Sequence, residues 1–585
     1  MKRNLPIDKL GNLVRGASKL LSMSTLLLTF PAVWLPETTF GVGSWSAVAT
    51  QPADSIGICL LLPDGTVLAE GSGANWWALT PDSTGSYVNG TWTARNSSGW
   101  GHQDGSTAVL QNGNVFVGGG ENGNGGNQVE IYNPVTGLWS TAVNPTYFGN
   151  ISDGNAMLLP DGRVLIQPEG ASSGYGGLTF LFNPGNNTFS QTTGAPSDAY
   201  GNIGLSETSW VKLPNDNVLA IDSDQLSTGA TTAEMYIPTA GIWTNAVTGG
   251  TVPNIWPDLS GSGIVSEMGP AFLLPNGKAI FFGGNGVTAI YDNGFWSQGA
   301  SLPVAGLGQK DAPGAMMVNG KILLAVSPQG VNSSKADGNG IGPTSFYEYD
   351  YLANAFTLAP SPGGGISSRA AVLKFLDLPS GNVLLSTGGS QLYVYHPDLS
   401  PLAAGQPNIN KVQWNPNGSL HLTGTLFNGI SQGAAYGDNE QMDSNFPLVR
   451  FTSGSTVYYG TTYNWSNTSV QTGGRIVTTE ATVPAAVLEF PGLWSLQVVA
   501  NGIASPGVSF YSPVWVDFNY AGFQNGWEPF PWATLPQGVS EVAGSFPGGT
   551  IAIEGNPSTG HEAVPYTIST PMTIISVNGP ATIKN

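Results

Sequence analysis

The stretch LLPDGTVL, residues 61–68, places a Pro-Asp-Gly turn between two apolar segments. Six more segments of the same design follow it: VLQNGNVF (109–116), LLPDGRVL (158–165), KLPNDNVL (212–219), LLPNGKAI (273–280), MMVNGKIL (316–323) and LDLPSGNVLL (376–385). Short apolar runs around such turns are typical of β-hairpins. The turn residues are 48, 49, 54, 61, 43 and 61 positions apart, about one β-propeller blade each with loop insertions. The sequence therefore predicts a repeated, all-β fold.

Most repeats also carry an aromatic residue after the turn and a second large apolar residue seven positions later. The pairs are Tyr132/Trp139, Phe182/Phe189, Tyr236/Trp243, Tyr349/Phe356 and Tyr395/Leu402, with Tyr291/Trp296 as a shorter version. Their regular placement predicts that they pack inside the blades and are not sugar platforms. We count seven blades across residues 43–402. The segment GSWSAVAT (43–50) is expected to pair with the last blade and close the ring, which protects the edge strands.

Charged residues are scarce and mostly acidic. They make up 9% of the 585 residues, against roughly 25% in an average soluble protein, and the formal net charge is −19. A strongly acidic protein repels phosphate backbones, so nucleic acid is not an expected partner. This composition favours a secreted protein that its carboxylates keep soluble.

Residues 1–42 have the features of an export signal. Five of the 18 basic residues lie in the first nineteen positions, ahead of the apolar run LLSMSTLLLTFPAVWLP (20–36). Pro31 interrupts this run, and about 20 apolar residues are needed to span a bilayer, so membrane contact is expected only through an uncleaved N-terminus. The single cysteine, Cys59, excludes an internal disulfide. We expect a secreted or cell-surface protein.

The sequence pattern changes after Pro401. Residues 403–518 contain several short strands with alternating apolar and polar residues, which favours an immunoglobulin-like β-sandwich. Residues 519–585 differ again, because PGGTIAIEG (547–555) and YTISTPMTIISVNGPATI (566–583) resemble the first rungs of a parallel β-helix. So short a segment is expected to lean on the sandwich or to serve as an attachment module.

The repeats resemble kelch-type β-propellers. The segments LTG (422–424), YGD (436–438), NFPLVRF (445–451) and GLWSLQVVANGIAS (492–505) extend this to the galactose oxidase architecture, which the chain resembles over roughly residues 43–515. Members of that family are copper radical oxidases. The resemblance therefore implies a copper ion held by two tyrosines and two histidines, with one tyrosine linked to a cysteine.

The residues of such a copper site are missing at the matching positions. The chain has four histidines, which are His102, His396, His421 and His561. The family's Tyr-His pair corresponds to Ser367-Ser368 here, whereas Tyr395-His396 follows the turn strand and occupies the packing position. Tyr458 and Tyr459 stand where the second histidine is needed, although spacing alone leaves a thioether on Cys59 open. Because copper in such a site needs imidazole ligands, we predict neither bound copper nor oxidase activity.

Acidic residues precede the turn at a nearly constant distance in five repeats. They are Asp104, Asp153, Glu207, Glu267 and Asp311, which lie 8, 8, 8, 9 and 8 positions ahead of the turn residue. Asp54 lies ten positions ahead in the first repeat, and Arg369 lies eleven ahead in the last. In a propeller this register predicts a ring of side chains at one mouth of the central channel. Like charges at close range favour a bound cation or hydrogen-bond donors.

Two interpretations of this ring stay open. The acids and Arg369 could bind a sugar, a polyol or Ca²⁺, which prefers carboxylate oxygens. Alternatively, each acid accepts backbone N–H groups from the neighbouring blade and stabilises the ring. Repetition in five blades favours the structural interpretation, because every blade needs such support and a ligand site does not.

The leading hypothesis is a secreted, non-catalytic binding or adhesion protein whose expected ligand is an extracellular carbohydrate or another cell-surface group. It requires no cofactor and assigns no catalytic residue, and it leaves the oligomeric state open. The alternative is an enzyme on the same scaffold that replaced the oxidase chemistry, such as a hydrolase with two carboxylates about 5–10 Å apart. A purely structural envelope protein is a third hypothesis.

Overall fold

The fold is described from a computed structural model of the 585-residue chain. It describes residues 42–584 except 121, 142–149, 152–153, 169–177, 194–207, 222–231, 256–267, 330–340, 399, 437–439, 490–491, 556–557 and 562–565. The predicted export signal therefore lies almost entirely outside the described residues. Within the described ranges, every helix is too short or too polar to cross a bilayer.

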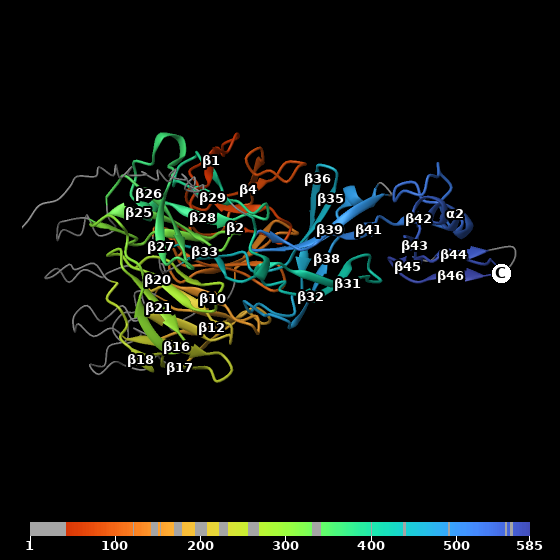
Figure 1. The fold of residues 1–585 in the computed structure, drawn as a ribbon. Coiled ribbons are helices and arrows are strands. Elements are labelled where there is room, and N and C mark those ends of the chain that lie inside the picture. The colour runs from red at the N-terminus through yellow and green to blue at the C-terminus, as the bar shows by residue number, and fades with distance from the viewer. Residues whose placement is uncertain are drawn as a thin grey trace, which may run out of the picture. The chain divides into compact units, whose positions relative to one another are not determined.

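Between residues 59 and 359 six sheets each contain a four-stranded antiparallel meander, and a seventh sheet over residues 374–396 is completed by an N-terminal strand (Figure 1). The first three are β2–β5 (Cys59–Leu61, Val67–Glu70, Trp76–Thr80, Thr91–Arg95), β6–β9 (Ser106–Val109, Val115–Gly118, Val129–Asn133, Leu138–Thr141) and β10–β13 (Ala156–Leu158, Val164–Ile166, Phe180–Asn183, Thr188–Gln191). The next two are β14–β17 (Trp210–Lys212, Val218–Ile221, Ala233–Ile237, Ile242–Asn245) and β19–β22 (Ala271–Leu273, Ala279–Phe282, Thr288–Asp292, Phe295–Gln298), to which β18 (Gly249–Gly250) is added.

The sixth sheet contains β24–β27 (Pro313–Met316, Ile322–Pro328, Ser345–Asp350, Ala355–Ala359), with β23 (Leu307–Gly308) beside β25. The seventh contains β28 (Lys374–Asp377), β29 (Val383–Ser386), β30 (Tyr393–His396) and the N-terminal β1 (Ser44–Ala47). Of the described residues, 43% lie in strands and 5% in helices. This succession of small antiparallel sheets is consistent with a β-propeller.

The predicted turns join the first and second strands of all seven sheets. At Asp64, for example, Oδ1 accepts a hydrogen bond from the Thr66 backbone N–H at 2.9 Å, which is the usual way an Asx residue closes a turn. The next residue, Gly65, has φ +78°, where a side chain would be strained. In the fourth sheet Asp216 takes that position with φ +71°. The hairpin prediction is therefore confirmed.

The aromatic pairs pack across the third and fourth strands. Ring centroids lie 5.0 Å apart in Tyr132/Trp139, 5.1 Å in Phe182/Phe189, 5.4 Å in Tyr236/Trp243, 5.2 Å in Tyr291/Trp296 and 5.1 Å in Tyr349/Phe356. The first member of every pair is buried. These side chains are core residues, as predicted.

The N-terminal strand closes the last sheet. β1 pairs antiparallel with β30, and the Trp45 ring packs at a tilt against Tyr395 and Phe346, with centroids 4.8 Å and 5.1 Å away. The predicted pairing of the N-terminal segment with the last sheet is confirmed, but the predicted Tyr395/Leu402 pair is wrong. Because β1 supplies the fourth strand, Leu402 packs instead in a separate cluster with Val318, Ile430 and Ile503.

Residues 408–511 form two antiparallel sheets around one apolar core. One sheet contains β31 (Asn408–Trp414), β32 (Leu420–Thr425), β38 (Ile476–Ala481) and β37 (Thr462–Tyr463). The other contains β36 (Thr456–Gly460), β35 (Leu448–Ser453), β39 (Leu493–Ala500), β40 (Ile503–Ala504) and β41 (Val508–Tyr511), and the short helix α1 (Ala485–Leu488) lies before β39. Leu422 of one sheet and Phe451 and Leu496 of the other are fully buried in this core.

A hairpin from this region extends the sixth sheet. It contains β33 (Gly433–Tyr436) and β34 (Glu440–Asp443), and β33 pairs antiparallel with β24 so that Tyr436 lies opposite Pro313. The hairpin also contacts β2, β6, β10 and β28, which are the first strands of four other sheets. It therefore lies where the first strands converge, an arrangement that the sequence did not predict.

The C-terminal segment stacks its strands in parallel. β42 (Val514–Val516), β43 (Thr550–Glu554) and β45 (Thr573–Val577) form one sheet, and β44 (Ser558–His561) pairs with β46 (Ala581–Lys584). This is the rung-like pairing expected for the tail. Helix α2 (Leu535–Ser545) buries Leu535, Val539 and Val542 against the first sheet. β42 falls inside the predicted range 403–518, yet it pairs with the tail.

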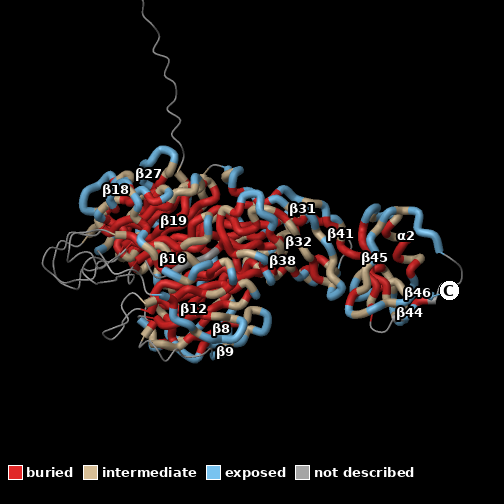
Figure 2. Tube along the Cα trace, turned by 90° about the horizontal axis from the view of Figure 1, so that it is seen from below, coloured by how far each residue is buried: buried red, intermediate tan, exposed pale blue. Residues whose placement is uncertain are grey.

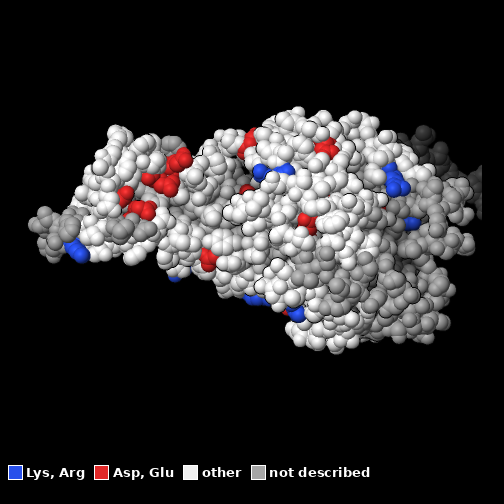
Figure 3. Space-filling model, turned by 180° about the vertical axis from the view of Figure 1, so that it is seen from behind, with Lys and Arg blue, Asp and Glu red and all other residues white. Residues whose placement is uncertain are grey.

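Most buried residues lie in the strands of the sheets, and the surface carries few charged side chains. Figure 2 shows the buried residues concentrated along the strands. On the face shown in Figure 3 charged side chains are few, and acidic side chains gather on the C-terminal part of the chain. Because only 9% of the residues are charged, several charged groups around one cavity are an uncommon feature of this molecule.

Candidate functional site

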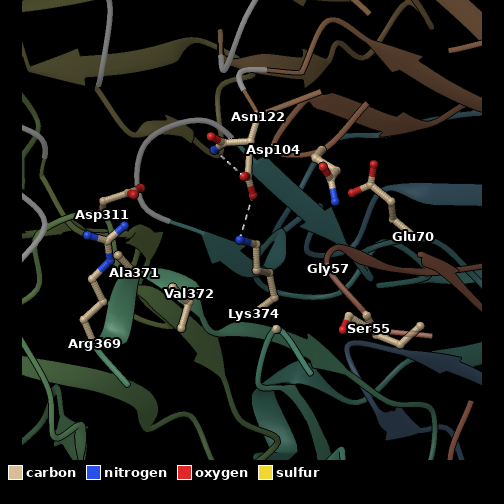
Figure 4. Close-up of a pocket in the computed structure, with 13 residues that line it drawn as sticks. Ser55, Gly57, Glu70, Asp104, Asn122, Asp311, Arg369, Ala371, Val372 and Lys374 are labelled. Carbon is tan, nitrogen blue, oxygen red and sulfur yellow. Dashed lines mark hydrogen bonds and ion pairs between the residues drawn. The ribbon is translucent and has the colours of Figure 1, made fainter. Parts of the chain in front are cut away.

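A cavity of about 390 Å³ lies at one end of the seven sheets (Figure 4). Its walls come from segments that precede the first strand of a sheet and from residues at the end of a second strand. In an antiparallel pair these two points lie at the same end of the sheet. The lining residues are Ser55, Ile56, Gly57, Glu70, Gln103, Asp104, Asn122, Asp311, Arg369, Ala371, Val372, Lys374 and Gly388.

Three of the six predicted site residues line this cavity, namely Asp104, Asp311 and Arg369. The other three, Asp153, Glu207 and Glu267, lie outside the described residues. Asp54 does not line the cavity and instead accepts hydrogen bonds from Ser72 Oγ at 2.6 Å and Asn75 Nδ2 at 3.1 Å. The structure therefore brings together residues that are 265 positions apart in the sequence, from Asp104 to Arg369.

Asp104 is held by two side chains from distant parts of the fold. Its Oδ1 accepts from Lys374 Nζ at 2.8 Å, and its Oδ2 accepts from Asn122 Nδ2 at 2.8 Å. The backbone of Asp104 has φ +56°, a conformation that residues other than glycine rarely adopt. Burial acts to raise the pKa of Asp104, but the charge and hydrogen bond of Lys374 outweigh it and lower the pKa below its usual value. Asp104 is therefore a carboxylate at neutral pH.

Lys374, which the sequence analysis did not single out, begins strand β28. Its side chain is 6% exposed, so its ammonium group depends on Asp104 for charge compensation. Asp104 precedes β6 of the second sheet and Lys374 belongs to the seventh sheet, so their ion pair joins two sheets that are far apart in the sequence. A lysine at the start of an otherwise buried strand was the only sequence signal for it.

Glu70 is the second residue that the sequence analysis missed. It ends the buried strand β3, is 1% exposed, and its Oε1 has no hydrogen-bond partner among the described residues. Burial raises the pKa of Glu70 to about 8, and the nearby charge of Asp104 adds to this effect. Lys374 and the backbone amides of Ile58 and His102 act in the opposite direction. Glu70 is therefore mostly protonated at pH 7.

Asp311 and Arg369 lie on the opposite side of the cavity from Glu70. Figure 4 shows the Arg369 guanidinium directed toward Asp311. Asp311 has φ +47°, and its backbone N–H donates to the Met268 carbonyl at 3.1 Å. Arg369 is followed by Ala370, whose N–H donates to Ser327 Oγ at 2.6 Å and so fixes this segment to the sixth sheet.

A buried hydrogen bond between His102 and Glu130 supports the loop that carries Asp104. His102 Nε2 lies 2.9 Å from Glu130 Oε2, and its Nδ1 lies 2.9 Å from the Gly119 carbonyl. Glu130 also accepts from the backbone N–H groups of Gly99 at 2.8 Å and Trp100 at 3.1 Å. The residues just ahead of Asp104 are thereby tied to strand β8, which limits the movement of Asp104.

The described histidines lie in separate environments. His396 contacts Ser46 and Asn382, His421 contacts Glu480, and the side chain of His561 lies outside the described residues. Cys59 is buried in the core. Among the described residues, no three His, Cys, Asp or Glu side chains are arranged to hold a metal ion. The expectations about copper and Ca²⁺ remain predictions.

Comparison with known proteins finds similarity to solved structures alone. No protein-family model and no curated protein matches it. A copper-bound fungal alcohol oxidase of the AA5 family is 12% identical, with a TM-score of 0.46 over 80% of this chain and 99% of the oxidase. YCF48 bound to a D1 peptide is 13% identical (TM-score 0.40; 62% and 98% covered), and YjhT is 15% identical (0.36; 54% and 100%). At these values no residue role or activity is transferred.

Proposed function

We propose that this protein is a secreted or cell-surface binding protein that holds a carbohydrate or another polyol in the channel-mouth cavity. The scaffold of the proposal is a seven-bladed kelch-type β-propeller followed by an immunoglobulin-like domain, in the galactose oxidase-like arrangement. The observation that supports it most strongly is the lining of the cavity, where hydrogen-bond donors and acceptors come from repeats that are far apart in the sequence.

The lining chemistry suits hydroxyl groups. Arg369, Lys374 and Asn122 present N–H donors, whereas Asp104 and Asp311 present carboxylate acceptors. A sugar hydroxyl both donates and accepts, so it satisfies either kind of group. The cavity volume of about 390 Å³ falls within the range of roughly 300–1,000 Å³ that is usual for small-molecule sites.

The charge of the cavity favours a neutral ligand over Ca²⁺. Among the described lining residues, with Glu70 protonated, two carboxylates face two cationic side chains, so this part of the lining is close to neutral. The Lys374 ammonium group also occupies the position beside Asp104 that a metal ion would take. Hydrogen bonding to a neutral polyol then supplies both affinity and orientation without an added counter-ion.

Binding is tested with purified protein on a glycan array, followed by titration calorimetry of the saccharide that is retained. Asp311→Asn and Arg369→Gln should each weaken binding at least tenfold and leave the melting temperature nearly unchanged. The exposed pair Lys278–Asp292 provides a matched control, because Asp292→Asn removes an acid outside the cavity. Variants that lower only the melting temperature would support the structural interpretation of the ring and contradict ligand binding.

Export is tested separately. Residues 1–42 fused to a reporter that folds only outside the cytoplasm should direct it out, and a fusion without the basic residues Lys2, Arg3, Lys9, Arg15 and Lys19 should not. Retention of the first fusion in the cytoplasm would contradict a secreted or cell-surface location.

A further inference from the structure

We infer that the cavity also cleaves a glycosidic bond of the saccharide that it binds, with Glu70 as general acid and Asp104 as nucleophile. This inference rests on the proposed carbohydrate binding and adds an activity to it. It depends on two carboxyl groups that line one cavity and whose surroundings differ: Glu70 is buried with an unpartnered oxygen, whereas Asp104 is hydrogen-bonded to Lys374 and Asn122.

Glu70 has the placement of a proton donor. It is 1% exposed, lines the cavity, and has one oxygen, Oε1, without a partner among the described residues. A buried polar atom without a partner is costly, so its retention at a cavity wall points to a group that arrives with the ligand. Figure 4 shows the Glu70 carboxyl group directed toward the side of the cavity where Asp104 lies.

The environment keeps the proton on Glu70. Burial and the charge of Asp104 raise its pKa to about 8, so most molecules carry the acid form at neutral pH. A carboxylic acid in this state donates to the oxygen of a leaving group. Glu70 and Asp104 line the same cavity, so one bound saccharide can contact both carboxyl groups.

Asp104 is kept in the opposite state. Hydrogen bonds from Lys374 and Asn122, both at 2.8 Å, keep it ionised although it is largely buried. Because its pKa is lowered, it is a poor base for water but a stable negative charge beside a developing positive centre. Two carboxyl groups whose pKa values are driven apart are the arrangement that glycoside cleavage requires.

The proposed reaction has two balanced steps. In the first, Glu70 gives its proton to the glycosidic oxygen while the bond from that oxygen to the anomeric carbon breaks and an Asp104 oxygen bonds to this carbon. In the second, the Glu70 carboxylate takes a proton from water, the water oxygen bonds to the anomeric carbon, and Asp104 leaves. One glycosidic bond and one water become two hydroxyl groups, and the anomeric configuration is retained.

The surrounding structure holds the two groups in place. The His102 backbone N–H donates a hydrogen bond to the Glu70 carboxyl group, and the same loop continues to Asp104 two residues later. His102 itself is fixed by Glu130 at 2.9 Å. The donor and the nucleophile are therefore positioned by one short segment, which limits their relative movement.

The test uses the full-length protein with 4-nitrophenyl and 2,4-dinitrophenyl glycosides of glucose, galactose, mannose and N-acetylglucosamine, and with the saccharide from the array. Glu70→Gln should slow cleavage of the unactivated saccharide about 10²–10⁴-fold. The 2,4-dinitrophenyl glycosides need no proton donor, so their cleavage should fall less than tenfold. The exposed Glu489→Gln is the matched control and should be unchanged.

The pH dependence gives a second readout. The wild-type rate should fall above about pH 8 as Glu70 loses its proton, and this limb should disappear in Glu70→Gln. Saccharide binding without any hydrolysis would overturn this inference and leave the proposed function intact, whereas absence of saccharide binding would overturn both. Equal slowing of both substrate types, or inversion at the anomeric carbon, would remove the roles given to Glu70 and Asp104.

Discussion

Replacing Asp377 by asparagine should stabilise the protein near neutral pH and flatten the dependence of its stability on pH. Asp377 ends strand β28, is 3% exposed and lies beside the base of the β33–β34 hairpin. Its Oδ2 accepts a long hydrogen bond, 3.4 Å, from Ser444 Oγ, and its Oδ1 has no partner among the described residues. Burial raises the pKa of Asp377 to about 8 from an ordinary value of 3.8.

The sign of the effect follows from proton binding. Between about pH 4 and pH 8 the folded protein keeps a proton on Asp377 that the unfolded chain has lost, so the free energy of unfolding falls as pH rises. Each pH unit costs about 1.4 kcal/mol, which amounts to roughly 4 kcal/mol at pH 7 as an upper bound. Asparagine removes this cost, but its buried amide donors lack acceptors and cost about 1–3 kcal/mol. The expected net gain at pH 7 is about 1–3 kcal/mol.

Thermal unfolding of wild type and Asp377→Asn at several pH values between 4 and 9 measures this difference. The variant should be no more stable than wild type at pH 4 and should become more stable as pH rises. Asp292→Asn, which changes an exposed carboxylate, should follow the wild-type curve. Glu70 contributes a slope of the same sign to both proteins, so the difference isolates Asp377. Parallel curves for wild type and Asp377→Asn would refute the buried-acid explanation.

Three further changes test other contacts. Lys374→Met should lower the free energy of unfolding by roughly 1–3 kcal/mol at pH 7, and by less as the pH falls through the lowered pKa of Asp104, as thermal unfolding would show. Trp45→Ala should cost about 2–4 kcal/mol, because it removes the partly buried aromatic contacts that hold β1 on the last sheet, and a urea titration giving under 1 kcal/mol would contradict this. Asn501 accepts from the Ile430 and Ser431 amides and donates to Ser444, so Asn501→Ala should speed hydrogen exchange at the hairpin base and spare β2–β5.

Several features of the fold could be predicted because they are written in local sequence. A turn such as Asp64-Gly65 needs only a side-chain acceptor and a residue tolerant of positive φ, and both are visible in the chain. The pair Tyr132/Trp139 is separated by one turn, so its contact follows from the hairpin. Asp104, Asp311 and Arg369 could be placed near one another because each keeps a similar distance from its turn.

Other features arise only when distant segments meet. Leu402 has the same spacing from Tyr395 as true partners have, yet ring closure gives that place to Trp45. The hairpin β33–β34 pairs with β24 across more than a hundred residues, and no local pattern marks it. Lys374 and Glu70 could not be predicted for the same reason, because the ion pair of Lys374 and the burial of Glu70 depend on residues that are distant in the sequence.

The sequence by itself determined the repeated hairpins, the packing of the aromatic pairs and the position of the closing strand, because turns and neighbouring strands depend on residues close together in the chain. Only the tertiary structure decided which charges meet. The pairing of Asp104 with Lys374, 270 residues away, and the desolvation that keeps a proton on Glu70 both require the sheets to be assembled. Ion pairing and burial are properties of that assembly, and they set the chemistry of the cavity.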